Sequence, residues 1–139
     1  MGHLSSLGGI FMVTFRSLVF TASVALASAA VAQEAYELND IKLAAIQRAV
    51  SLQLKDPDSA KFGPVKAVPF PGVQEGVILV CGLVNAKNGF GGYAGEAPFV
   101  GVLATYRQSG QAEFIVREIG GAETDSASII SYCKSQGIR

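Results

Sequence analysis

Two cysteines and the placement of histidine determine which kinds of chemistry this chain can perform. Cys81 and Cys133 are the only cysteines, and the only histidine is His3. Nucleophilic catalysis by serine or cysteine usually relies on an imidazole as proton acceptor, and zinc sites usually require imidazole or several free thiolates. Because no histidine lies in the segment 33–139, we expect no catalytic site of this kind, no metal site and no cofactor there.

The two cysteines are 52 positions apart and do not form the C-x-x-C motif that is typical of redox pairs. Pairing of two lone cysteines is favoured in an oxidising compartment. We therefore predict a Cys81–Cys133 disulfide with a structural role. The alternative is two free, buried thiols.

Carboxylates are the other side chains that could perform catalysis. Eleven aspartate and glutamate residues are scattered along the chain, without a motif that brings two of them together. A carboxylate-based hydrolase requires two such groups about 5 to 10 Å apart in a cleft. This class of enzyme stays an alternative, and so does a lysine nucleophile.

A glycine-rich segment over 85–98, NAKNGFGGYAGEAP, is the most unusual part of the sequence. Glycines allow close approach of the backbone, and neighbouring polar side chains could hold an anion or a partner's backbone. The segment satisfies neither the dinucleotide-binding fingerprint nor the Walker loop. The candidate binding residues are Asn85, Lys87, Asn88 and Tyr93.

The alternative interpretation of this glycine-rich loop is purely structural. In that case it is a tightly wound connection between two strands, with Phe90 and Tyr93 packed over an open end of the core.

The elements that position these residues follow from hydrophobic periodicity. Apolar residues at steps of three and four predict a helix over 39–54, capped by Asn39 and ended before Pro57. Alternating patterns predict strands over 65–70, 77–86, 99–107 and 113–119, of which the first is suited to a sheet edge because of its prolines. A final helix begins at Thr124 or Asp125 and ends at Gly137.

The predicted fold class is α+β. We expect the order α-β-β-β-β-α, in which a four-stranded antiparallel sheet has the N-terminal and the C-terminal helix packed on one face. In the strand over 77–86, both faces are apolar, so this strand is predicted to be central and covered on much of both sides. Cys81 of that strand meets Cys133 of the last helix in this arrangement.

The segment 1–32 has the pattern of a secretory signal peptide. Arg16 precedes an uncharged apolar run over 18–32, which ends in Ala-Val-Ala. This run is shorter than the roughly 20 apolar residues that a membrane-spanning helix requires, so a retained anchor is the less favoured alternative. We therefore predict cleavage after Ala32, a single domain over 33–139, and a periplasmic or secreted location. Met12 is a possible true start, because 12–32 is a complete signal by itself.

The predicted mature chain, 33–139, has nearly balanced charge. The leader contains Arg16 and no acidic residue, so ten basic and eleven acidic side chains remain. Binding to nucleic acid or to an anionic membrane surface usually requires a basic face. We therefore expect neither of these partners.

Several segments together resemble a family of small uncharacterised exported proteins and lipoproteins of Gram-negative bacteria. The similarity covers about half of the mature chain, and its relatives often have glutamate where this chain has Leu83 and arginine where it has Gly63. The resemblance implies export and an α+β fold, but no activity or ligand. It lies in LKDPDSAKF at 54–62, VCG at 80–82, VNAKN at 84–88, GGY at 91–93 and Gly95.

These observations favour a small periplasmic module that binds another envelope protein through the glycine-rich loop. A second hypothesis is an inhibitor that inserts this loop into a foreign hydrolase. The third hypothesis is the carboxylate-based hydrolase. The oligomeric state does not follow from the sequence.

Overall fold

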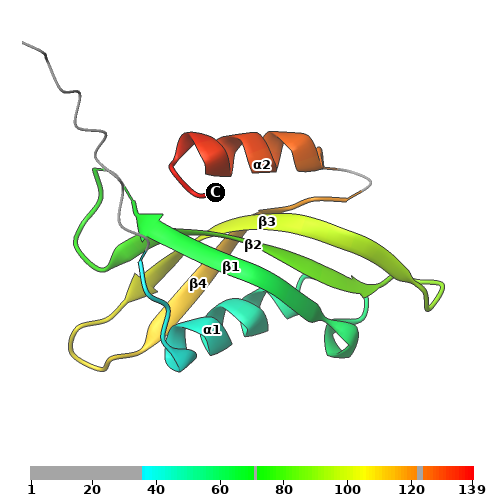
Figure 1. The fold of residues 1–139 in the computed structure, drawn as a ribbon. Coiled ribbons are helices and arrows are strands. Elements are labelled where there is room, and N and C mark those ends of the chain that lie inside the picture. The colour runs from blue at the N-terminus through cyan, green and yellow to red at the C-terminus, as the bar shows by residue number, and fades with distance from the viewer. Residues whose placement is uncertain (1–35, 71, 122–123) are drawn as a thin grey trace, which may run out of the picture. The chain divides into compact units, whose positions relative to one another are not determined.

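The computed structural model describes residues 36–70, 72–121 and 124–139 of the chain, and the predicted signal peptide over 1–32, with its possible start at Met12, lies outside these ranges. The predicted order of helices and strands is confirmed, with one short 3-10 helix in addition (Figure 1). The elements are α1 (Asp40–Ser51), η1 (Pro57–Ser59), β1 (Lys61–Pro69), β2 (Val77–Lys87), β3 (Tyr93–Thr105), β4 (Ala112–Ile119) and α2 (Ser126–Ser135).

Both helices begin at the predicted capping residues. The side chain of Asn39 accepts a hydrogen bond from the backbone N–H of Lys42 at 3.1 Å, and Asp125 accepts one from Ala127 at 3.0 Å. These bonds satisfy N–H groups that have no partner within the helix. The first helix ends earlier than predicted, because the N–H of Leu54 bonds to Ser51 in a tighter turn.

The four strands form an antiparallel sheet in the order β1-β2-β3-β4, so that each strand pairs with its neighbour in the sequence. β1 is an edge strand, as predicted, although it begins at Lys61 and therefore includes Pro64. The pairing of β1 with β2 shifts between Phe62 and Val65. A bulge at an edge tolerates proline, because the missing N–H is not required by a ladder there.

The prediction that both helices pack on one face of the sheet is wrong. Figure 1 shows α1 and α2 on opposite sides of the sheet, and the buried residues form two separate clusters. Alternate residues of β2 point to opposite faces: Val80 belongs to the cluster of Ile46 from α1, whereas Leu79 belongs to the cluster of Ile129 from α2. Each apolar face of the central strands therefore has its own helix, which accounts for the apolar character of both sides of β2.

The centre of the α1 face is Phe99, which is fully buried. Its ring makes edge-on contacts with Phe62 and Phe114, at centroid distances of 6.2 and 6.3 Å. Two glycines leave room for these rings, since a Cβ at Gly82 would lie 2.5 Å from the Phe99 ring and one at Gly101 would overlap the Phe114 ring. The packing of the sheet therefore requires glycine at both positions.

The predicted disulfide between Cys81 and Cys133 is confirmed. The two Cα atoms are 6.3 Å apart, and the bond joins the middle of β2 to α2. Both cysteines belong to the apolar cluster of the α2 face. The bond therefore fixes α2 to the sheet, while α1 is held on the other face by packing.

Among the described residues, no helix has the length and hydrophobicity that crossing a membrane requires.

Candidate functional site

The four residues predicted to bind a partner lie together around the hairpin that connects β2 to β3. Asn85 and Lys87 belong to the end of β2, Asn88 begins the turn, and Tyr93 begins β3. Lys87 and Tyr93 are paired across the two strands. The second half of the glycine-rich segment is thus strand, and the turn itself is shorter than the sequence suggested. We call the residues between the two strands, 88–92, the tip loop.

The tip loop is held by hydrogen bonds within itself. The side-chain oxygen of Asn88 accepts from the N–H groups of Phe90 and Gly92, at 2.9 and 3.2 Å. The backbone of Asn88 also bonds to Gly92 and Gly91. Gly91 has a φ of 83°, which favours glycine. The loop is therefore a defined turn in which the side-chain oxygen of Asn88 has a structural role.

Asn85 has a similar internal role at the base of the hairpin. Its side-chain oxygen accepts from the N–H of Gly95 at 3.2 Å, beside the shift in pairing between Asn85 and Lys87. Two of the four predicted binding residues thus use a side-chain acceptor to shape the hairpin.

The 3-10 helix η1 supports this hairpin from the side through Ser59. The Ser59 hydroxyl donates to the backbone oxygen of Asp56 at 2.8 Å and accepts from the N–H of Lys87 at 2.9 Å. The hydroxyl of Tyr93 donates to the backbone oxygen of Ser59 at 3.3 Å. The segments 54–62 and 84–93, which are separated in the sequence, are therefore in contact.

Tyr93 lies between two lysines. The Nζ atom of Lys61 is 4.4 Å from the centroid of the Tyr93 ring, and that of Lys87 is 5.9 Å from it. A cation near the face of an exposed aromatic ring contributes about 0.5 to 1 kcal/mol. In the described part of the chain, neither lysine forms an ion pair with an acidic side chain. This surface is therefore aromatic and positively charged.

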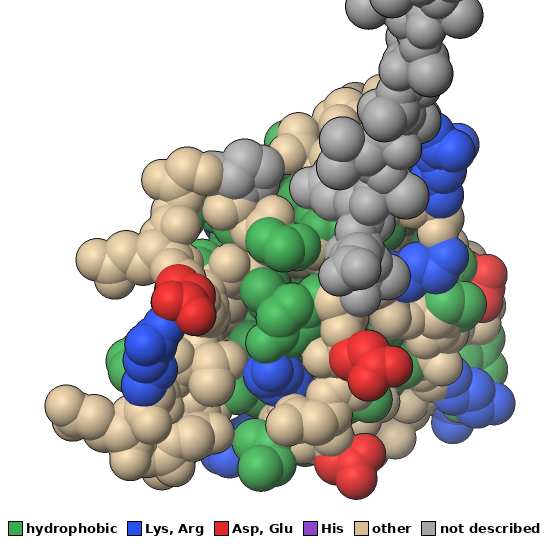
Figure 2. Space-filling model, turned by 60° about the vertical axis from the view of Figure 1, so that its left-hand side comes forward, with side chains coloured by type: hydrophobic (Ala, Val, Ile, Leu, Met, Phe, Trp, Pro, Cys, Tyr) green, Lys and Arg blue, Asp and Glu red, His purple; other side chains and the backbone are tan. Residues whose placement is uncertain are grey.

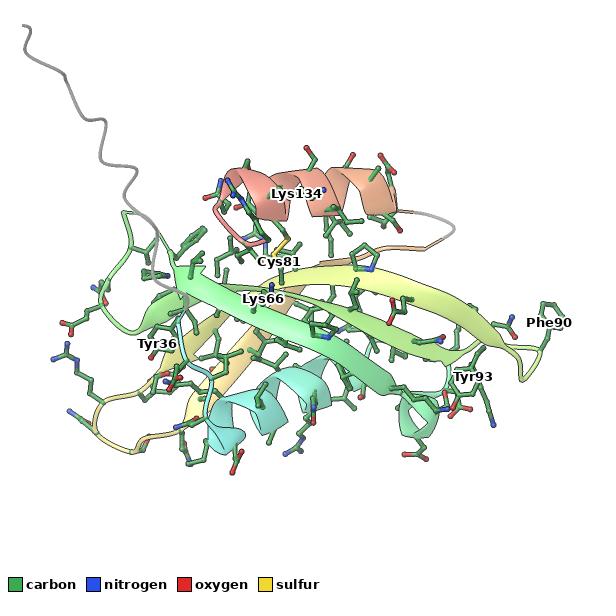
Figure 3. The ribbon with its side chains drawn as sticks, in the orientation of Figure 1. Tyr36, Lys66, Cys81, Phe90, Tyr93 and Lys134 are labelled. Carbon is green, nitrogen blue, oxygen red and sulfur yellow. A yellow bond between two sulfur atoms is a disulfide. The ribbon has the colours of Figure 1, made fainter. Side chains whose placement is uncertain are left out.

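Phe90 is the residue of this site that the sequence interpretation placed wrongly. The structural alternative packed it over the core, but its side chain is 99% exposed. Figure 3 shows Phe90 at the far end of the hairpin, away from the body of the molecule, with Tyr93 nearer to the sheet. The sequence signal for this exposure was a phenylalanine within a run of glycines. The turn is too short to fold that side chain back over the core.

A groove of about 460 Å³ lies behind the tip loop. Lys55, Lys87 and Asn88 line it together with apolar residues such as Leu54 and Val84. The groove could accommodate part of a partner that binds the loop.

The other end of the sheet is formed by residues 72–76 and the 106–111 hairpin. There an ion pair joins Arg107 to Glu75, and the large apolar residues Val73 and Tyr106 are about half exposed. Figure 2, which brings this side of the molecule forward, shows hydrophobic side chains gathered in its middle with charged side chains around them.

The described carboxylates lie at the surface of the protein. No described aspartate or glutamate is buried. The described residues also contain no group of three or more histidine, cysteine, aspartate or glutamate side chains that could hold a metal ion. The Asp125 carboxylate has a pKa below its ordinary value, because it accepts hydrogen bonds from the Ser128 hydroxyl and the Ala127 N–H. A general acid requires a raised pKa instead, so Asp125 has the character of a helix cap.

Gly63 and Leu83 are neighbours on β1 and β2. A Cβ added to Gly63 would lie 3.2 Å from the Cβ of Leu83. An arginine and a glutamate at these two positions would therefore face each other.

Comparison of the chain with family models, curated proteins and solved structures finds no match.

Proposed function

We propose that the protein is a binding module that works outside the cytoplasm and inserts the side chain of Phe90 into an apolar pocket of another envelope protein. The main support is the almost complete exposure of this large apolar side chain on a hydrogen-bonded turn. Exposing a phenylalanine to water has a free-energy cost, which a partner removes by burying the ring.

The bonds within the hairpin favour this role because they fix the loop before binding. Ordering a flexible loop would consume part of the binding free energy, whereas a loop already held by Asn88 and Ser59 requires little reorganisation. Lys61 and Lys87 beside Tyr93 would provide a charged rim around the buried contact. A central aromatic residue with a polar rim is the usual composition of a binding hot spot.

A variant with Phe90→Ser tests the proposal. Truncation of a hot-spot residue usually costs about 2 kcal/mol or more, so we expect affinity for a partner to fall about 30-fold or more. Because the side chain makes no buried contact, thermal stability should stay unchanged. Ile41→Ser is the matched control, since Ile41 is 60% exposed at the beginning of α1, which lies at the opposite end of the molecule from the hairpin (Figure 1).

The measurement is capture of a periplasmic protein by the immobilised module, followed by titration of the purified partner. Equal affinity of the Phe90→Ser variant and the wild type for that partner would refute the proposal. Tyr93→Ala is a less selective variant, because the loss of its bond to Ser59 and of its contact with Lys61 would also loosen the hairpin.

The inhibitor hypothesis uses the same loop and is the second candidate. A rigid, projecting turn has the shape required to enter an enzyme cleft without rearrangement. Nanomolar inhibition of a wall-degrading hydrolase that is lost in the Phe90→Ser variant would distinguish it from binding of a non-enzymatic partner.

A further inference from the structure

The face of the sheet covered by α2 contains a groove that the tip loop does not line. The ten residues of α2 span about 15 Å, whereas the thirteen residues of β3 beneath it span about 43 Å. The helix therefore leaves part of the face open. One opening, which we call the disulfide groove, has a volume of about 290 Å³ and lies beside the Cys81–Cys133 bond.

The disulfide groove has an apolar floor. Cys81, Cys133 and Ile138 of the α2-face cluster are buried beneath it, and Ile130 is 40% exposed at its edge. The remaining apolar residues around it are Pro64, Leu83 and Pro98.

The rim of the groove is positively charged. Lys66, Lys134 and Arg139 line it and are exposed, and none of the described residues that line it has an acidic side chain. The Lys66 ammonium group, which has three donors, donates one hydrogen bond to the backbone oxygen of Arg139. Even if that oxygen belonged to a carboxylate, the three cations would leave the rim with a net positive charge. In the groove on the other side of α2, by contrast, Arg117 is accompanied by Glu118.

The disulfide determines where the two lysines lie. Lys66 on β1 is paired across the sheet with Cys81, and Lys134 follows Cys133 directly on α2. Figure 3 shows Cys81 between Lys66 on the sheet side and Lys134 on the helix side. The covalent bond joins β2 to α2, and β1 is paired with β2, so the bond helps to hold the strand of Lys66 close to the helix of Lys134.

We infer that the disulfide groove binds a single-chain amphiphile with a carboxylate head group. The carboxylate pairs with Lys66 and Lys134, and the hydrocarbon chain lies on the floor toward Leu83 and Pro98. A volume of about 290 Å³ corresponds to the liquid volume of about ten water molecules, so the groove has room for a short hydrocarbon chain.

The orientation of the amphiphile follows from a nearby acidic residue. A carboxylate oxygen of Glu96 would lie 3.4 Å from a Cβ added at Gly63, and the same Cβ would contact Leu83. Glu96 is therefore close to the Leu83 end of the groove, where its carboxylate would repel the carboxylate head group of the amphiphile. The head group is accordingly directed to the opposite end, where the lysines lie.

This site is independent of the loop function, because neither Phe90 nor Tyr93 lines the groove. The two proposals can therefore fail separately.

The test is a titration of the oxidised protein with sodium decanoate, followed by amide chemical shifts in NMR spectra. We expect saturable shifts at residues of the groove. Decan-1-ol, which has the same chain length and a neutral head, should bind at the same place with lower affinity. An absence of saturable shifts at the groove, or shifts confined to another surface, would overturn the inference.

Two double variants distinguish recognition of the head group by Lys66 and Lys134 from nonspecific electrostatic attraction to the protein. Lys66→Gln with Lys134→Gln should weaken decanoate binding about five- to tenfold, as expected for two exposed ion pairs, and leave decanol binding unchanged. Arg48→Gln with Arg107→Gln removes the same charge from exposed positions that line none of the grooves described above, and should leave both affinities unchanged. Equal loss of decanoate binding in the two double variants would refute specific recognition of the head group.

A variant of the floor tests the apolar half of the site. Leu83→Ser should weaken the binding of both decanoate and decanol, because both chains contact the same surface. Unchanged binding of both compounds would show that the chain does not lie on this floor, and would overturn the inference.

Discussion

Removal of the disulfide is the perturbation whose magnitude follows most directly from the structure. The bond between Cys81 and Cys133 closes a loop of 52 positions. The chain-entropy relation for such a loop gives about 14 cal/mol/K, or about 4 kcal/mol near room temperature. Small domains usually have a free energy of unfolding of about 5 to 15 kcal/mol, so this one bond contributes a large fraction of it.

The variant to measure is Cys81→Ala with Cys133→Ala, because alanine places no unpaired hydroxyl in the buried positions of the α2 face. Unfolding in urea should show a midpoint about 2 to 3 M lower for a denaturant slope of about 1.5 kcal/mol/M, and a steeper slope, because the unfolded chain exposes more surface. The wild-type protein in reductant should behave in the same way. A loss below about 1 kcal/mol with an unchanged slope would refute the assignment of stability to loop closure.

Three further predictions concern single residues. Gly101→Ala should lower the free energy of unfolding by about 1 to 3 kcal/mol in urea melts, because the added methyl group would overlap a buried aromatic ring and a backbone oxygen, whereas Gly89→Ala, which faces open space, should have little effect. Asn88→Ala should speed amide hydrogen exchange in the tip loop while leaving the urea midpoint almost unchanged, since the bonds that it removes are local and exposed. The pKa of Asp125 is lowered in the folded state by its hydrogen bond from Ser128, so its contribution to stability is present above the ordinary value of 3.8 and is lost as the pH falls through the folded value. Asp125→Asn should accordingly flatten the acid side of a stability profile against pH, and an acid side identical to that of the wild type would contradict this assignment.

The sequence was sufficient for the elements, their order and the disulfide because these depend on local patterns and on the presence of only two cysteines. Asn39 and Asp125 mark the helix starts, and alternating apolar residues mark the strands. Local patterns do not determine the side of the sheet on which each helix packs. Both faces of β2 are apolar, so Cys81 required α2 on its own face but left the face for α1 undetermined.

The sequence indicated where the glycine-rich hairpin lies, but not which contacts its side chains make. The glycine-rich sequence correctly indicated a connection between strands, but which side chains face outward depends on the turn. Asn85 and Asn88 are used as acceptors by the hairpin's own N–H groups, and Phe90 is exposed because the turn is too short to fold it back. The bond between Ser59 and Lys87 joins residues that are 28 positions apart, and no local pattern reports such a contact.

The order of the strands has a consequence for how the chain acquires its shape when it emerges from N- to C-terminus. Every strand after the first finds its partner immediately before it in the sequence, so the sheet can assemble progressively while synthesis continues. Cys133 follows all four strands in the sequence, so its thiol emerges after they are present. The disulfide can therefore form only after the residues of all four strands have emerged, and it then joins α2 to the sheet.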